Sequence, residues 1–194
     1  MLWVGLTGGI ASGKTTVAEM LRQRSVPVVD ADLFAHQALQ ALRPELIQIF
    51  GSSILNRAGD VDRKSLGHLV FSDKKKLSQL ESLVHPWIQE KVRQERQKLA
   101  SQGHDLAVYD VPLLFEKNLQ DQFDKILVVY LPQELSLKRL AQRNQISPKE
   151  ATRRMSHQID IEDKKLKADF VIDNQGSLQD LEKQVEQWLS VIKK

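Results

Sequence analysis

A glycine-rich run near the start of the chain has the residue types and the spacing that bind phosphate. Residues 8–15 read Gly-Gly-Ile-Ala-Ser-Gly-Lys-Thr, which fits the pattern G-x-x-x-x-G-K-[ST]. The run follows the apolar stretch 2–6 and precedes a helical stretch, the context in which this pattern is credible. Glycine lets the backbone approach an anion, and N–H groups at a helix N-terminus hold phosphate oxygens. We therefore predict a nucleoside triphosphate site rather than a glycine turn without a ligand.

The loop residues have distinct expected roles. Lys14 would reach the β- and γ-phosphates, and the Thr15 hydroxyl would be a ligand of Mg²⁺. The predicted nucleotide-binding residues of the loop are Gly9, Ile10, Ala11, Ser12, Gly13, Lys14, Thr15 and Thr16.

Two acidic groups follow apolar stretches that we interpret as strands. The second stretch ends in Asp30-Ala31-Asp32, and the third ends in Asp110-Val111-Pro112. Ligands of open parallel sheets bind beyond the carboxyl ends of the strands, so these carboxylates are expected near the nucleotide. Asp32 can serve as a base for an attacking hydroxyl or as a helix N-cap. Asp110 can assist the metal or merely end its strand, and both readings stay open.

Short apolar runs alternate with amphipathic stretches along the chain. The predicted strands are Leu2–Leu6, Val26–Val29, Leu106–Val111, Lys125–Tyr130 and Asp169–Ile172. Runs of this kind are typical of strands buried on both faces. The sequence therefore predicts an α/β fold in which helices cover both faces of a five-stranded parallel sheet, giving three layers.

Two connections are too long for simple crossovers. A helical insertion would fill 31–103, with breaks at Pro44, Gly51 and 56–59 and a new helix at His85-Pro86. The second connection, 132–158, carries six basic and two acidic side chains, a net +4, whereas the whole chain carries +3. It is either a solvated basic hairpin or a lid that brings arginines onto polyphosphate. The core of the single domain would then be 1–30, 104–131 and 159–194.

Composition restricts the class of protein. The 194 residues are 41% apolar and include no cysteine, which excludes disulfides and thiolate metal sites and fits a reducing cytoplasm. The first strand starts at residue 2, so we expect no signal peptide, and no apolar run is long enough to span a membrane. Basic residues are not interleaved with aromatic ones, so we expect no nucleic-acid partner.

Several motifs, in the same order, resemble the dephospho-coenzyme A kinase family over nearly the whole chain. They are the runs 6–15, 29–32 with Ala35-His36, 59–63, 83–86 and 112–116, then Arg139-Leu140 with Arg143, Gln158, and Ala168-Asp169 with Ile172 and Asn174. The chain departs from the family pattern at Ala11, usually Gly, at Thr15, commonly Ser, and at Lys138, usually Gln. None of these changes removes a group that the chemistry requires.

The resemblance implies a P-loop kinase core with an acceptor-binding insertion and a lid, and the last step of coenzyme A synthesis. ATP, with Mg²⁺, would phosphorylate the ribose 3′-hydroxyl of dephospho-coenzyme A in a monomer or weak homo-oligomer. Lys14, Asp32, Arg139 and Arg143 would be catalytic, and Asn174 would lie beside the adenine. The acceptor site would comprise Thr7, Asp32, His85, Pro86, Leu113, Leu114 and Phe115.

Some of these residues also have purely structural explanations. Pro86 can start a helix, and the apolar Leu113–Phe115 can belong to the core. Two other activities remain open: another small-molecule or nucleoside monophosphate kinase, and a nucleotide-dependent binding protein that forms no phosphorylated product. The chain lacks the Asn-Lys-x-Asp motif with which switch GTPases read guanine.

Overall fold

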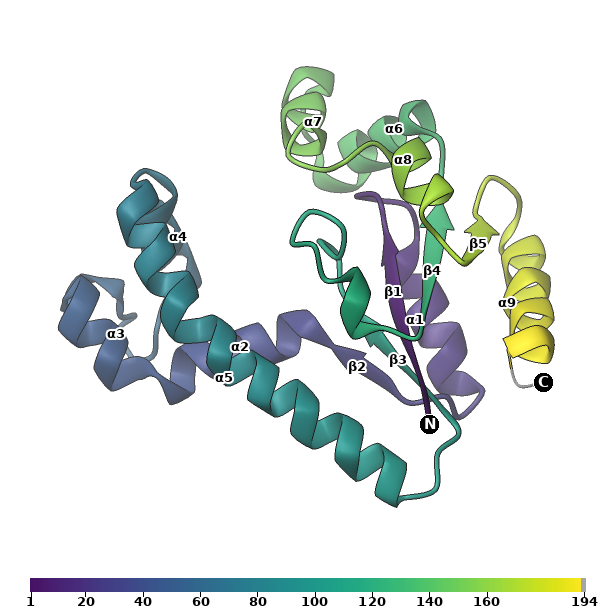
Figure 1. The fold of residues 1–194 in the computed structure, drawn as a ribbon. Coiled ribbons are helices and arrows are strands. Elements are labelled where there is room, and N and C mark those ends of the chain that lie inside the picture. The colour runs from purple at the N-terminus through teal and green to yellow at the C-terminus, as the bar shows by residue number, and fades with distance from the viewer. Residues whose placement is uncertain (193–194) are drawn as a thin grey trace. The chain divides into compact units, whose positions relative to one another are not determined.

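The computed structural model describes residues 1–192 and divides into two compact units. The first unit comprises Met1–Asp30 and the chain from Leu99 onward, and the second comprises Ala31–Lys98. Figure 1 shows both, with the second unit running from α2 to α5. No helix in the described part of the chain is both long enough and apolar enough to cross a membrane.

A five-stranded sheet forms the centre of the first unit. Its strands are β1 (Leu2–Gly8), β2 (Val28–Asp30), β3 (Leu106–Asp110), β4 (Lys125–Tyr130) and β5 (Phe170–Asp173). All neighbours pair in parallel, in the order β2-β3-β1-β4-β5. The predicted α/β fold with a five-stranded parallel sheet is confirmed.

Strand β2 begins two residues later than the sequence predicts, and β5 begins one residue later. The Val26 N–H donates to the Leu21 carbonyl at 3.0 Å, which closes the turn after the first helix. Pro27 has no N–H to donate to a ladder. Sheet pairing therefore starts at Val28, although Val26 is as apolar as a strand residue should be.

Five helices accompany this sheet. They are α1 (Lys14–Gln23), α6 (Gln133–Asn144), α7 (Pro148–Met155), α8 (Ile161–Leu166) and α9 (Leu178–Ile192). Residues Val17 and Leu21 of α1 and Val185 of α9 pack with alternate residues of β1, such as Leu6, in one apolar core. The other β1 positions face the segment after β3: a Cβ on Gly5 would lie 2.6 Å from Leu114. Helices thus cover one face, and the 112–123 segment with α8 covers the other.

The basic connection 132–158 folds as the helical hairpin α6–α7. Gln145 ends α6 in the left-handed conformation, with φ of 52°. Ser147 then caps α7 by accepting a hydrogen bond from the Glu150 N–H, and Pro148 occupies the first helical position, where its missing N–H has no cost. Both helices belong to the first unit.

The second unit is helical and has its own core. It contains α2 (Ala31–Ala41), α3 (Arg43–Phe50), α4 (Arg63–Phe71) and most of α5 (Lys74–Ser101). The core residues are Leu46, Phe50, Ile54, Val61, Leu66 and Val70. Asn56 accepts hydrogen bonds from the Ala58 and Asp60 N–H groups and so forms the turn that pairs Leu55 with Val61.

The expected helix start at His85-Pro86 is wrong. Pro86 lies inside α5, which runs without a break for 28 residues. An interior proline disfavours a helix by about 3 kcal/mol. The helix tolerates it because Leu77, Leu80 and Leu83 pack against the core of the second unit on the N-terminal side. On the other side, Arg93 donates to the two carboxylate oxygens of Glu90 from two of its three guanidinium nitrogens.

Candidate active site

The glycine-rich loop joins β1 to α1 in a backbone conformation that glycine alone adopts easily. Gly13 stands at the N-cap of α1 with φ of 93°, and no side chain caps this helix. A Cβ on Gly13 would lie 2.1 Å from the amide nitrogen of Asn174. Any larger residue would therefore meet both backbone strain and a collision. The first N–H groups of α1 lack helical acceptors, as an anion-binding loop requires.

Ala11 shares the left-handed conformation, with φ of 61°. An L-residue with a side chain adopts this conformation at a cost of about 1–2 kcal/mol. The strain explains why glycine would be the easier choice at this position. It also indicates that the surrounding loop contacts determine the backbone here more strongly than local preference does.

Lys14 forms an ion pair with Asp110 at the carboxyl edge of the sheet. Both side chains are largely buried, with 15% and 7% exposed. Asp110 pairs in register with Leu6 of β1 and with Asp30 of β2, so the two strands that flank β3 position it. Asp110 therefore does more than end its strand, because it pairs with Lys14; its assistance to a metal stays a prediction.

Asp32 lies two residues after Asp30, the last residue of β2. The N-cap explanation is wrong, because α2 already begins at Ala31 and Asp32 lies in its first turn. Its side chain is exposed. A carboxylate in the first turn of a helix interacts favourably with the helix dipole.

The other predicted acceptor residues differ in accessibility. The Thr7 side chain is buried and donates to the Pro112 carbonyl at 3.2 Å. Leu114 and Phe115 are buried in the core of the first unit, whereas Leu113 is 38% exposed. Core packing, the structural explanation, therefore holds for two of these three apolar residues. His85 and Pro86 are exposed on α5 of the second unit.

Asn174 contacts the loop directly. It is buried, and its side-chain amide donates to the Ser12 carbonyl at 2.7 Å. Arg139 of α6 donates to the Asn174 carbonyl at 3.1 Å, which links the α6–α7 hairpin to the residue after β5. Arg143 is exposed one turn further along α6 and bonds the side chain of Asn144.

Sequence reasoning assigned no role to three residues that also bind the loop or its surroundings. Gln158 accepts a hydrogen bond from the Ile10 N–H at 2.8 Å. Lys164 is fully buried, pairs with Glu116 at 2.7 Å and donates to the Gly8 carbonyl at 3.5 Å. Gln158 and Glu116 stood in recognisable motifs, but no single-sequence signal indicates which groups they contact.

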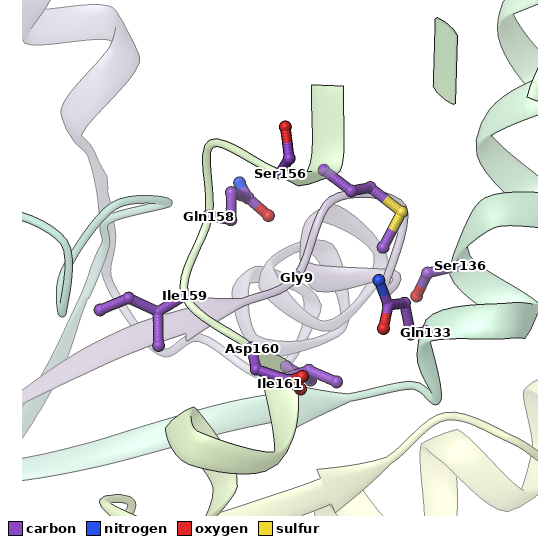
Figure 2. A pocket seen from close by; sticks show the side chains of 9 residues that line it. Gly9, Gln133, Ser136, Ser156, Gln158, Ile159, Asp160 and Ile161 are labelled. Atoms are coloured by element: carbon purple, nitrogen blue, oxygen red, sulfur yellow. The ribbon is translucent and has the colours of Figure 1, made fainter. Parts of the chain in front are cut away.

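A pocket of about 130 Å³ lies between the loop and the residues that follow α7. Figure 2 shows its lining: Gly9, Gln133, Ser136, Met155, Ser156, Gln158, Ile159, Asp160 and Ile161. Nearby, the Tyr130 hydroxyl donates to Glu162 at 2.5 Å, which raises the pKa of Tyr130 to about 12. Tyr130 therefore stays protonated at neutral pH and fastens α8 to β4, so it is no candidate for a base.

The parallel sheet, the loop and Lys14 define the class as a P-loop kinase. A shikimate kinase from Bacteroides thetaiotaomicron has the same fold, with a TM-score of 0.54 at 14% identity. More specifically, the chain belongs to the dephospho-CoA kinase family, whose model matches residues 2–180.

Individual relatives agree with this assignment. The dephospho-CoA kinase of Bacillus licheniformis is 43% identical over 97% of this chain and 95% of its own. The solved dephospho-CoA kinase of Campylobacter jejuni superimposes with a TM-score of 0.78 at 34% identity, covering 98% of this chain and 96% of that one. The solved structure of TT1252 from Thermus thermophilus superimposes with a TM-score of 0.87 at 35% identity, covering 98% of this chain and 97% of that one.

Proposed function

We propose that this kinase transfers the γ-phosphate of ATP to the ribose 3′-hydroxyl of dephospho-coenzyme A, giving coenzyme A and ADP. The observation that carries the proposal is the complete phosphate loop, with Lys14 beside Asp110, in a chain that matches the family model over residues 2–180. Another small-molecule kinase would share the loop, but the family match covers the insertion and the hairpin as well.

On the nucleotide side, the loop N–H groups and the α1 N-terminus would hold the phosphates. Lys14 would exchange Asp110 for the β- and γ-phosphates, where a positive charge stabilises the charge that spreads over the transferring group. We propose that Asn174, which fixes the Ser12 carbonyl, lies beside the adenine. Phosphoryl transfer depends mainly on positioning and charge, so these contacts should dominate the rate.

The residues present fit a magnesium ion. The Thr15 hydroxyl is exposed in the first turn of α1, and the Asp30 and Asp110 carboxylates lie at the same edge of the sheet. Mg²⁺ prefers such oxygen ligands and is usually held by one or two protein groups together with substrate phosphates. We propose Thr15 as the direct ligand. Bound there, the ion would neutralise charge on the phosphates.

On the acceptor side, we propose Asp32 as the base that orients and deprotonates the ribose hydroxyl. Its exposure in the first turn of α2, directly after β2, supports this role. His85, Pro86 and the exposed Leu113 are proposed acceptor contacts. Thr7, Leu114 and Phe115 would act by shaping the site from within the core, since their side chains are buried.

We propose that 132–158 acts as a lid whose Arg139 and Arg143 approach the phosphates. An open site would let water accept the phosphoryl group, and closure over the bound acceptor suppresses this reaction. Arg139 already reaches the Asn174 carbonyl next to the loop, and Arg143 follows one turn later on α6. We further propose a cytoplasmic location and a monomer or weak homo-oligomer.

A coupled ADP-release assay against a panel of acceptors tests the proposed function. With Mg-ATP, dephospho-coenzyme A should be phosphorylated in preference to AMP, CMP, dTMP and shikimate. Mass spectrometry should find one added phosphate, at the 3′ position. No mass gain on dephospho-coenzyme A, together with rapid phosphorylation of a nucleoside monophosphate, would favour the other kinase activity.

A further inference from the structure

We infer that Gln158, Lys164 and Glu116 act together as positioning residues for the phosphate loop. We call this set the loop brace. Gln158 and Lys164 come from the segment between α7 and the end of α8, and Glu116 comes from the segment after β3. None of the three belongs to the loop, yet their contacts reach both Gly8 and Ile10 within it.

The ion pair at the centre of the brace is buried. The Lys164 side chain is 0% exposed and the Glu116 side chain 11%. One oxygen of Glu116 accepts hydrogen bonds from both Lys164 Nζ, at 2.7 Å, and the Ile159 N–H, at 3.0 Å. Separating such a pair would leave an uncompensated charge away from water, which is strongly destabilising. The pair therefore fixes the path of the chain from Ile159 to α8.

The brace then contacts the loop at two points. Lys164 Nζ donates to the Gly8 carbonyl at 3.5 Å, and Gln158 Oε1 accepts from the Ile10 N–H at 2.8 Å. Figure 2 shows Gln158 and Gly9 lining the same pocket. Because Lys164 is fully buried, it acts on phosphate only through the loop backbone. It is a positioning residue, unlike the partly exposed Lys14.

The strain at Ala11 explains what the brace is for. Ala11 lies between the two residues Ile10 and Ser12, whose polar groups are held by Gln158 and Asn174. Holding the flanking residues keeps Ala11 in a conformation that it would otherwise leave. A loop that is already in its binding geometry loses less entropy when phosphate arrives, so the brace should strengthen nucleotide binding.

The first test removes one hydrogen bond and keeps the packing. Gln158→Met is similar in length but cannot accept from Ile10, so the dissociation constant of ADP should rise about 3–10-fold, the usual worth of one net hydrogen bond. The matched control is Gln187→Met on α9, the same substitution at an exposed glutamine outside the loop. Tighter ADP binding by Gln158→Met would mean that Gln158 competes with phosphate for the Ile10 N–H, and it would overturn the inference.

The second test separates loop positioning from stability. Lys164→Met alone leaves Glu116 charged and buried, so the melting temperature should fall sharply. The double variant Lys164→Met/Glu116→Gln is neutral and should recover most of that loss. It should still bind ADP about 3–10-fold more weakly and have a lower kcat/KM for ATP, whereas the exposed control Lys167→Met should change neither. If the stable double variant bound ADP with wild-type affinity, the Lys164–Glu116 pair would stabilise the fold without positioning the loop.

These measurements rest on the proposed nucleotide site but not on the identity of the acceptor. ADP binding is measured without an acceptor by isothermal titration calorimetry. If the wild-type protein bound ADP but failed to phosphorylate dephospho-coenzyme A, the proposed function would fail and the brace would stand. If the brace variants bound ADP with wild-type affinity while the wild-type protein phosphorylated dephospho-coenzyme A, the brace would fail and the proposed function would stand.

Discussion

At the scale of single residues, the charge of Lys14 has two expected effects, one on phosphate binding and one on the stability of the fold. Lys14 is the expected phosphate ligand, yet it also neutralises Asp110, which is 7% exposed. A mutation of either residue therefore changes stability and chemistry together. Asp32 differs from this pair, because it is exposed in the first turn of α2. Its effect on catalysis can be measured with little interference from folding.

Lys14→Ala should lower turnover by about 10³-fold or more, since it removes a charge that stabilises the transferring phosphoryl group. It also takes a partner from the buried Asp110 carboxylate, so the melting temperature should fall as well. The double variant Lys14→Ala/Asp110→Asn removes that charge and should regain stability without regaining activity. Steady-state kinetics and thermal unfolding of both variants check this. Substantial turnover in a folded Lys14→Ala protein would contradict the nucleotide-site assignment.

Asp32→Asn should lower kcat by about 10²–10⁴-fold, the usual contribution of a general base. The free energy of unfolding should change by less than about 1 kcal/mol, because Asp32 is exposed and asparagine keeps the size of the side chain and an oxygen that accepts hydrogen bonds. Kinetics with saturating acceptor, alongside denaturant unfolding, measure both quantities. Near wild-type turnover would leave Asp32 without a catalytic role.

At the scale of elements, the predictions of the strands were mostly correct because apolar runs buried on both faces are strong local signals. The strand Lys125–Tyr130 has the predicted bounds. The helix through Pro86 was missed because its stability comes from packing of Leu77, Leu80 and Leu83, which local preference cannot reveal. The pairs Lys14–Asp110 and Lys164–Glu116 join distant parts of the chain, so spacing along the sequence gives no indication of them.

Pro86→Ala should stabilise α5 by about 1–3 kcal/mol, since it restores a backbone donor and removes a clash in an exposed helix interior. If Pro86 contacts the acceptor, the KM for dephospho-coenzyme A should rise in the same variant. Urea unfolding and acceptor titrations measure the two effects, and Gln89→Ala on the same helix is the control, with an expected change of only a few tenths of a kcal/mol. A loss of stability in Pro86→Ala would mean that the proline is favoured by its packing.

Arg143→Ala should reduce kcat more than it weakens ATP binding, because the proposed contact forms mainly when the lid closes. Lys149→Ala removes the same charge from another exposed position of the hairpin and should leave kcat nearly unchanged. Direct titration of ATP beside turnover separates binding from closure. Equal losses in affinity and kcat would place Arg143 in the open nucleotide site instead.

At the scale of the whole molecule, we propose that the first compact unit binds the nucleotide and that the second contributes acceptor contacts of its own. The phosphate loop, the loop brace and the proposed lid hairpin belong to the first unit, as does Leu113, whereas Asp32, His85 and Pro86 belong to the second. The second unit has a core of its own, and it is larger than a connection between two adjacent strands requires. Dephospho-coenzyme A carries a pantetheine arm besides its ribose, and we expect the second unit to bind that part of the acceptor.

Adenosine presents the same ribose hydroxyl without the pantetheine arm and therefore tests this division. Its kcat/KM should be lower than that of dephospho-coenzyme A by about 10²-fold or more, because binding energy from the remote part of a substrate is used to position the reacting group. Its kcat should fall as well as its affinity if that energy drives closure of the lid. Initial rates over a range of acceptor concentrations, with ATP fixed at saturation, separate the two parameters. A kcat for adenosine equal to that for dephospho-coenzyme A would mean that the second unit serves binding alone and that the ribose is sufficient to close the site.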